Sequence, residues 1–154
     1  MTLSEVGGVY QICSLVFTPE GGLPPAVDLV AQSMEPSRPR ELRLGRTTPE
    51  FQLEYTLKGD VLRRDLRGSY ETGTRTVTLT FTSSAAETGA LLLPSSTGPN
   101  RLVLGFEGGS LQVSTPAYEV RKVDYERLTG QSYPAVKERF NGTLTGRFSS
   151  GSCG

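Results

Sequence analysis

The sequence predicts an all-β fold, an antiparallel up-and-down barrel of about eight to ten strands with one or two short helices before the last strand. Three observations favour it: apolar and polar residues alternate, tight-turn residues separate the alternating stretches, and successive hairpins run from residue 51 to residue 115. A meander of that length protects its edges most easily by closing on itself. This favours a barrel over a β-sandwich, the other arrangement that the pattern allows.

Two stretches show the alternation most clearly. In 51–58, Phe51 and Tyr55 belong to an apolar set that alternates with polar residues, as in a half-buried strand. In 76–82 every second residue is Thr, which is both β-branched and polar and therefore suits the solvent-facing side of a sheet.

The remaining strands follow from weaker alternation and from the turns between them. Turns are predicted at 58–60, at Thr72-Gly73 and at Gly108-Gly109. The other predicted strands cover residues 8–18, 41–45, 61–71, 91–93, 101–107, 110–115, 118–123 and 140–148. The last of these is well placed to pair with the first and close the barrel.

Two segments do not show a strand pattern. The stretch 20–40 is rich in Gly and Pro, which predicts a long connection or flap. Residues 124–130 are expected to form a short helix that Asp124 caps, and 132–140 a second one with Pro134 near its first turn.

Length and composition limit the possible functions. The 154 residues fit one barrel domain, 1–148, followed by a flexible Gly/Ser tail, 149–154. The absence of His removes His-based catalysis and imidazole zinc sites, and we expect no cofactor and no metal. With 16 basic and 16 acidic residues, nucleic acid is not the expected partner. Residues 38–67 are locally basic, which is typical either of a basic patch or of solvated outer strand faces.

The chain has no apolar run long enough for a membrane span and no recognisable secretory signal at Met1–Glu5. If the protein is exported, we expect this sequence to be the mature form. A monomer or a weak homo-oligomer is expected.

The two cysteines, Cys13 and Cys153, lie near opposite ends of the chain. A disulfide between them would close a loop spanning most of the molecule. The interpretation that we favour from sequence is that Cys13 is a small buried residue and that Cys153 belongs to the flexible tail.

The order of these elements resembles that of the lipocalin-like, or calycin, barrels. The residues behind the comparison are Gly8-Val9-Tyr10 at the start of the first strand, the loop 19–40, the hairpins 51–82 and the closing strand 140–148. The family carries Trp where this chain has Tyr10. In shape the chain is also similar to small bacterial extracytoplasmic proteins with lipocalin-like domains, which favours a periplasmic or secreted location. The resemblance implies a small apolar ligand inside the barrel.

Aromatic residues on predicted inward faces are the candidate lining of a ligand cavity, and plain core packing is the alternative interpretation. The candidates are Phe51, Tyr55, Tyr70, Phe81, Phe106 and Tyr118.

Arg64 is the most informative single residue, because in the strand 61–71 it alternates with the apolar set. A buried guanidinium needs a carboxylate, a barrel mouth or an anionic ligand. Arg64 is therefore a candidate ligand-binding residue, with a structural salt bridge or an exposed end as the alternative.

Three functions compete. The first is a small-molecule binding protein that holds a hydrophobic or amphipathic ligand, with 19–40 as a lid. The second is a structural or interaction domain with a filled core and no ligand. The third is a barrel isomerase or cyclase, which would need a carboxylate with a raised pKa inside the cavity.

Overall fold

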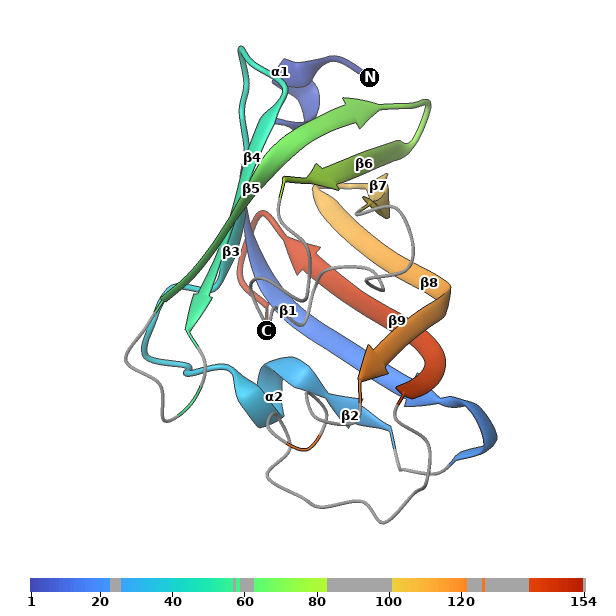
Figure 1. Ribbon diagram of the computed structural model, residues 1–154. Coiled ribbons are helices and arrows are strands. Elements are labelled where there is room, and N and C mark those ends of the chain that lie inside the picture. The colour runs from blue at the N-terminus through green and yellow to red at the C-terminus, as the bar shows by residue number, and fades with distance from the viewer. Residues whose placement is uncertain are drawn as a thin grey trace.

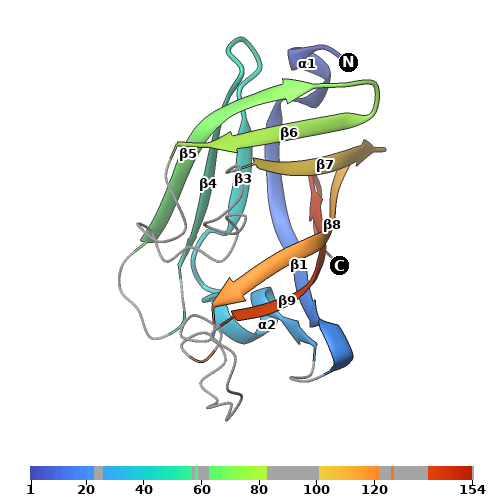
Figure 2. The ribbon, with the colours of Figure 1, turned by 45° about the vertical axis from the view of Figure 1, so that its right-hand side comes forward.

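The computed structural model is a closed barrel of eight antiparallel strands (Figures 1 and 2). Strands β1 and β3 to β9 pair in chain order, and β9 pairs back onto β1. A short additional strand, β2, pairs with β1 next to β3. The up-and-down barrel predicted from the sequence is confirmed.

The structure describes residues 1–22, 26–56, 58, 63–82, 101–121, 126 and 139–153. The strands are β1 (Gly8–Pro19), β2 (Val27–Asp28), β3 (Glu41–Leu44), β4 (Glu50–Thr56), β5 (Arg63–Thr72), β6 (Thr76–Phe81), β7 (Arg101–Glu107), β8 (Ser110–Arg121) and β9 (Arg139–Ser149). The helical segments are α1 (Leu3–Val6), the 3-10 turn η1 (Glu20–Gly22) and α2 (Leu29–Ser33).

Strand β8 corrects one detail of the sequence prediction, which divided it into 110–115 and 118–123. The two parts form one strand, and its register against β9 shifts between Thr115 and Tyr118. Pro116 lies in this interval and has no N–H to donate to a ladder, so the strand bends there instead of ending.

Some predicted elements cannot be compared. The strand predicted at 91–93 lies outside the described residues, as does most of the helical stretch predicted over 124–140. Within that stretch the structure describes Glu126, and residues 139–140 belong to β9 rather than to a helix. The single domain over 1–148 and the mobility of the tail stay predictions.

The connection predicted at 20–40 contains more regular structure than a loop. It holds η1, β2 and α2. Asp28 forms the N-cap of α2, and its Oδ1 accepts hydrogen bonds from the backbone N of Val30 at 3.1 Å and of Leu15 at 3.2 Å. One carboxylate thus starts the helix and fastens it to β1.

The interior of the barrel is apolar. Along β6 and β7 the buried residues alternate with exposed or half-buried ones, as expected for a wall with one dry and one wet face, whereas Leu53 to Thr56 of β4 are all buried. The buried apolar side chains are Val6, Tyr10, Ile12, Leu15, Phe17, Leu29, Val30, Met34, Leu42, Leu44, Phe51, Leu53, Tyr55, Leu66, Tyr70, Val77, Leu79, Phe81, Leu102, Leu104, Leu111, Val113, Leu144 and Phe148.

A β-bulge at Cys13 shifts the alternation of inward-facing and outward-facing residues along β1. Ile12 pairs with Phe148 of β9, and the next pair is Ser14 with Arg147, so Cys13 is an extra residue. As a result Ile12 and Leu15 both face the core although three positions separate them, and Cys13 is only half-buried.

Cys13 and Cys153 form a disulfide, with their Cα atoms 5.2 Å apart. The preference for two free thiols was therefore wrong. The reason is topological: Gln11 of β1 pairs with Ser149 of β9, so a cysteine shortly after Ser149 returns to the start of β1. The disulfide links Cys153 to β1.

Candidate functional site

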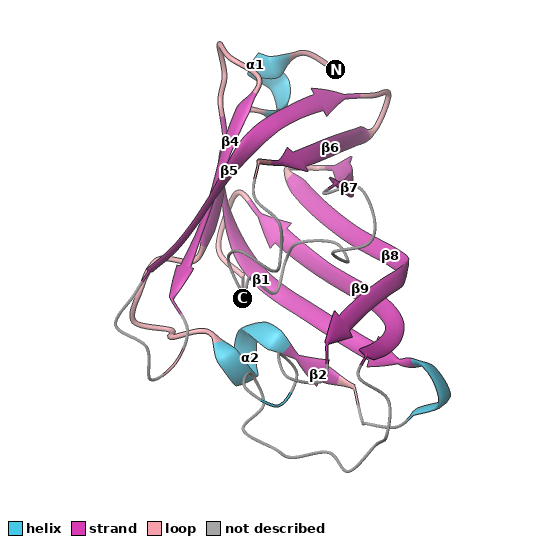
Figure 3. Cartoon of the chain, in the orientation of Figure 1, coloured by secondary structure: helices cyan, strands magenta, loops and turns pink. Residues whose placement is uncertain are grey.

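The barrel has two ends, each covered by a short helix, and a wall of strands between them (Figure 3). Helix α1 lies across one end and α2 across the other (Figures 1 and 3). The predicted site residues are distributed between these ends and do not form one cluster.

Four of the predicted lining residues are buried in the core, with exposed fractions of 3% for Phe51, 0% for Tyr55, 2% for Tyr70 and 4% for Phe81. Phe106 is only half-buried and packs against the edge of the core. These placements agree with an inward face for the alternating aromatic set.

The backbone positions of the two remaining candidates are described, whereas their side chains lie outside the described part. Arg64 pairs with Tyr55 across β4 and β5. Tyr118 pairs with Gly142 across β8 and β9.

Phe51 and Phe81 meet around a glycine in the middle of the wall. Gly68 of β5 is the register partner of both residues, and the two rings pack edge to face with centroids 5.0 Å apart. A methyl group on Gly68 would lie 2.7 Å from Cε1 of Phe51 and even closer to the carbonyl oxygen of Thr80. The missing side chain leaves the space that the rings fill.

The α1 end is sealed by two tyrosines that donate to backbone carbonyls. Tyr10 Oη donates to the carbonyl oxygen of Val6 at 2.5 Å, and Tyr70 Oη donates to that of Gly45. Burial raises the pKa of both phenols, and for Tyr10 the nearby Tyr70 raises it further while Arg46 lowers it. Both hydroxyls thus donate to the backbone, and a role of Tyr70 in ligand binding stays a prediction.

The N-terminal segment is held against this end by further contacts. The side chain of Thr2 caps α1 by accepting from the backbone N of Glu5 at 3.3 Å. Thr72 Oγ1 of β5 donates to the carbonyl oxygen of Met1 at 3.0 Å. Gly7 lies so close to Arg46 that a methyl group there would come within 2.9 Å of the Arg46 Cα. The α1 end is therefore closed by polar contacts as well as by Val6.

The α2 end is covered mainly by apolar packing. Leu29, Val30 and Met34 of the α2 segment are buried, with exposed fractions of 3%, 3% and 1%. The backbone N of Glu35 donates to the carbonyl oxygen of Thr56 at 2.8 Å, which places this segment beside the end of β4. Lys58 Nζ donates to the carbonyl oxygen of Ala31, also at 2.8 Å.

Tyr55 and Arg64 belong to the α2 end, because Tyr55 immediately precedes Thr56 at the end of β4. The sequence prediction that these two residues share an inward register is consistent with their pairing. They are separated from Tyr70 and its partner Gly45, which belong to the α1 end.

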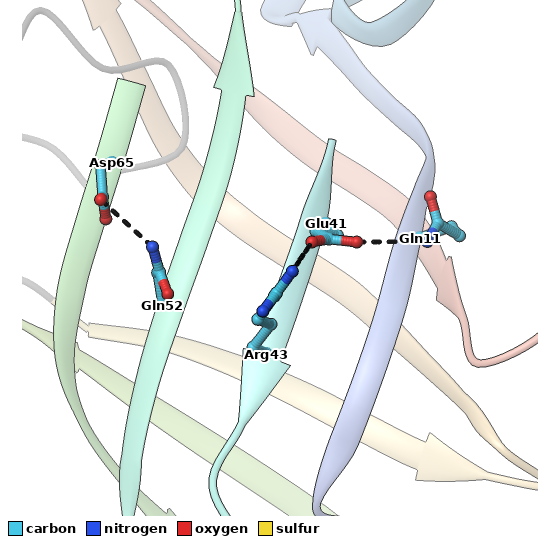
Figure 4. A network of polar contacts seen from close by, with 5 residues as sticks. All are labelled: Gln11, Glu41, Arg43, Gln52 and Asp65. Atoms are coloured by element: carbon cyan, nitrogen blue, oxygen red, sulfur yellow. Dashed lines mark hydrogen bonds and ion pairs between the residues drawn. The ribbon is translucent and has the colours of Figure 1, made fainter. Parts of the chain in front are cut away.

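The outer face of β3 to β5 carries charges that pair with one another (Figure 4). Glu41 accepts from Arg43 at 2.6 Å and from Gln11 at 3.5 Å, and the hydrogen bond and charge of Glu41 raise the pKa of Arg43. On β5, Asp65 accepts from Gln52 at 3.1 Å and pairs with Arg67 at 3.4 Å. Arg43 and Arg67, two arginines of the basic stretch 38–67, thus belong to a solvated outer face.

Glu54 differs from its outer-face neighbours because only 9% of it is exposed. Its register partners are Glu41 on β3 and Asp65 on β5, so three carboxylates stand side by side across three strands. Glu54 is not on the inward face, since it alternates with Leu53 and Tyr55. It therefore does not supply the interior carboxylate that a barrel isomerase would need.

Sequence reasoning missed the residues that cover the two ends. Tyr10 was used only for the resemblance, and Leu29, Val30 and Met34 fell in a stretch predicted as a loop. One signal could have identified the second group: Asp28 is a good N-cap and precedes two apolar residues.

Within the described ranges no group of three or more His, Cys, Asp or Glu side chains is placed to hold a metal ion. No helix of the described part is long and apolar enough to cross a membrane.

Comparison of the chain with models of protein families, with curated proteins and with solved structures finds no match.

Proposed function

We propose that this protein binds a small hydrophobic or amphipathic molecule inside the barrel, in the manner of lipocalin-like proteins. The closed antiparallel architecture and the apolar inner face support this proposal. An eight-stranded barrel has an interior just wide enough either to be filled by side chains or to hold one small ligand.

The observation that carries the proposal is the difference between the two ends. At the α1 end, Tyr10, Tyr70 and Thr72 donate to backbone carbonyls and seal the barrel. At the α2 end the cover is a five-residue helix in a long connection, and its buried contacts are mostly apolar. Hydrogen bonds fasten this cover at Asp28, Ala31 and Glu35. Between those points its contacts are apolar and not directional, so the helix can shift to admit a ligand.

Arg64 gives the proposal a chemical preference. Its register position opposite Tyr55 places it at the α2 end, where an amphipathic ligand would present its head group. We assign to the guanidinium the role of binding a carboxylate, for which its geometry is well suited. The ligand class is then an apolar chain or ring system with an acidic group.

The disulfide supports an exported location. Disulfides persist in oxidising compartments and are rare in the cytosol of mesophiles. A periplasmic or secreted protein is therefore the proposal that fits the Cys13–Cys153 bridge.

The proposal is tested with a fatty acid and the alcohol of equal chain length, measured by displacement of a fluorescent apolar probe. Arg64→Met should weaken binding of the acid by about tenfold or more, the size of a lost charge-assisted hydrogen bond, and leave the alcohol almost unchanged. Arg67→Met is the matched control, because Arg67 lies on the outer face of the same strand and is 69% exposed.

Equal weakening of acid and alcohol by Arg64→Met would remove the head-group role. Failure of the probe and of both ligands to bind the unmodified protein would favour a structural domain with a filled core.

A further inference from the structure

The barrel closes where its first and last strands lie side by side (Figures 1 and 2). We call this pairing the β1–β9 seam; it runs from the pair Gln11 and Ser149 to the pair Pro19 and Gly142. The seam joins segments from opposite ends of the chain. Its closure therefore carries a larger loss of chain entropy than any hairpin of the meander.

The seam is interrupted by the bulge at Cys13. The ladder is regular up to the pair Ile12 and Phe148 and resumes at Ser14 and Arg147. The extra residue of a bulge is left without a ladder partner, so the hydrogen bonding is locally broken at this point.

Two glycines of β9 weaken the inner side of the same seam. Gly146 pairs with Leu15, and Gly142 pairs with Pro19. Glycine loses more backbone freedom on folding than other residues and offers no side chain for packing. Larger residues do not fit, because a methyl group on Gly146 would lie 2.9 Å from Cδ2 of Leu15 and one on Gly142 would lie 2.9 Å from Cε1 of Phe17.

The disulfide spans this weak region on the outside of the barrel. Cys13 is the bulge residue itself, and Cys153 follows shortly after Ser149, the last residue of β9. Arg147 Nη2 donates to the carbonyl oxygen of Cys153 at 3.0 Å, which holds the tail beside the seam. Both cysteines are only half-buried.

We propose that the Cys13–Cys153 bridge is a reducible latch on the β1–β9 seam. In the oxidised protein it keeps the two strands in register whenever their hydrogen bonds break. Reduction by two molecules of an external thiol supplies two electrons and two protons; the S–S bond breaks, both cysteines become thiols, and the reductant molecules form a disulfide with each other. The barrel stays folded through its other pairings, while the seam opens more often. The latch does not depend on whether a ligand binds inside.

Hydrogen exchange resolved by residue or by short peptide tests the latch. Exchange rates are compared between seam amides, in 14–18 and 143–147, and amides of the β3–β4 ladder, in 42–44 and 51–53. The compared samples are the oxidised protein, the protein reduced with dithiothreitol, and Cys153→Ser. The ratio of seam to ladder rates should rise by about tenfold or more in the last two, because local opening is controlled by local stability.

Arg147→Gln is the matched control, because it removes the hydrogen bond to the Cys153 carbonyl and keeps the bridge. This variant should leave the ratio near that of the oxidised protein. If it raises the ratio as much as Cys153→Ser does, the tail and not the bridge holds the seam, and the proposal is wrong.

The ratio also separates the latch from a general loss of stability. An unchanged ratio overturns the proposal, whether the rates stay constant or rise equally everywhere. Loss of the far-UV circular dichroism of strands after reduction also overturns it, because the bridge would then be needed for the whole fold.

Discussion

Gly68→Ala tests whether the wall of the barrel is packed as tightly as the Phe51–Phe81 contact implies. The new methyl group would lie 2.7 Å from Cε1 of Phe51, whereas carbon atoms in contact prefer about 3.5 to 4.0 Å. The ring cannot retreat freely, since it packs on Phe81 at 5.0 Å. The carbonyl oxygen of Thr80 lies closer still, and it belongs to the backbone of the neighbouring strand.

Overpacking of this kind costs about 1 to 3 kcal/mol of the free energy of unfolding. For a chain of 154 residues, about 2 kcal/mol corresponds to a fall in the unfolding midpoint of roughly 4 to 8 °C. The assay is thermal and urea unfolding followed by far-UV circular dichroism, because the chain has no Trp to serve as a fluorescence probe.

Gly105→Ala is the matched control on β7. A methyl group there meets nothing nearer than the carbonyl oxygen of Gln112 at 3.9 Å, so the substitution should be neutral or stabilise by about 0.4 to 1 kcal/mol through the unfolded chain. Equal effects of the two substitutions would refute the packing argument, because they would reflect strand glycine in general and not the space beside Phe51.

Two further results follow from the cross-link and from the α1 end. Cys153→Ser should lower the free energy of unfolding by up to about 5 kcal/mol in the chain-entropy account, because the bridge spans 140 residues. Urea unfolding in oxidising buffer measures this loss. A loss under about 1 kcal/mol would contradict the prediction. Tyr70→Phe should cost about 1 kcal/mol at pH 8 through its lost hydrogen bond to Gly45. Because burial raises the pKa of Tyr70 in the folded state, its contribution is fully present below the unfolded pKa of about 10 and is lost as the pH rises through the folded value. Unfolding midpoints of both proteins between pH 8 and 11 should therefore converge, and a constant gap would contradict this reasoning.

The strands of the barrel could be predicted because their two faces meet different solvents. The alternation of Val77, Leu79 and Phe81 with threonines reports burial on one side only, and the structure places all three in the core. Local patterns of this kind carry the information because neighbouring strands of a meander are also neighbours in sequence.

The covers of the two ends could not be predicted in the same way. Their stabilising contacts are long-range: Tyr70 donates to the carbonyl of Gly45, and Thr72 donates to that of Met1. No periodicity encodes such a pairing. The four-residue helix α1 is also too short to produce a repeat.

The disulfide could have been predicted from the barrel topology. Once the last strand pairs with the first, the antiparallel register brings the residues after Ser149 back to Gln11. The prediction of free thiols considered only the residues next to Cys13 and Cys153 in the sequence and not the pairing of the two strands. The bulge that turns Cys13 outward is a tertiary feature, and its trace in the sequence is the shift in phase between Ile12 and Leu15.

The difference between the ends is the basis of the proposed function. One end is closed by tyrosine hydroxyls that donate to backbone carbonyls. The other is covered by α2 and holds the register position of Arg64. This difference between the two ends is the reason for proposing that the barrel holds a ligand.

Native mass spectrometry of the protein purified from its source tests this claim most directly. The account predicts a mass above that of the oxidised chain by one small molecule, which denaturation releases and extraction identifies as an apolar compound with an acidic group. Repeated recovery of the bare chain, together with no uptake of fatty acids added in excess, would contradict it.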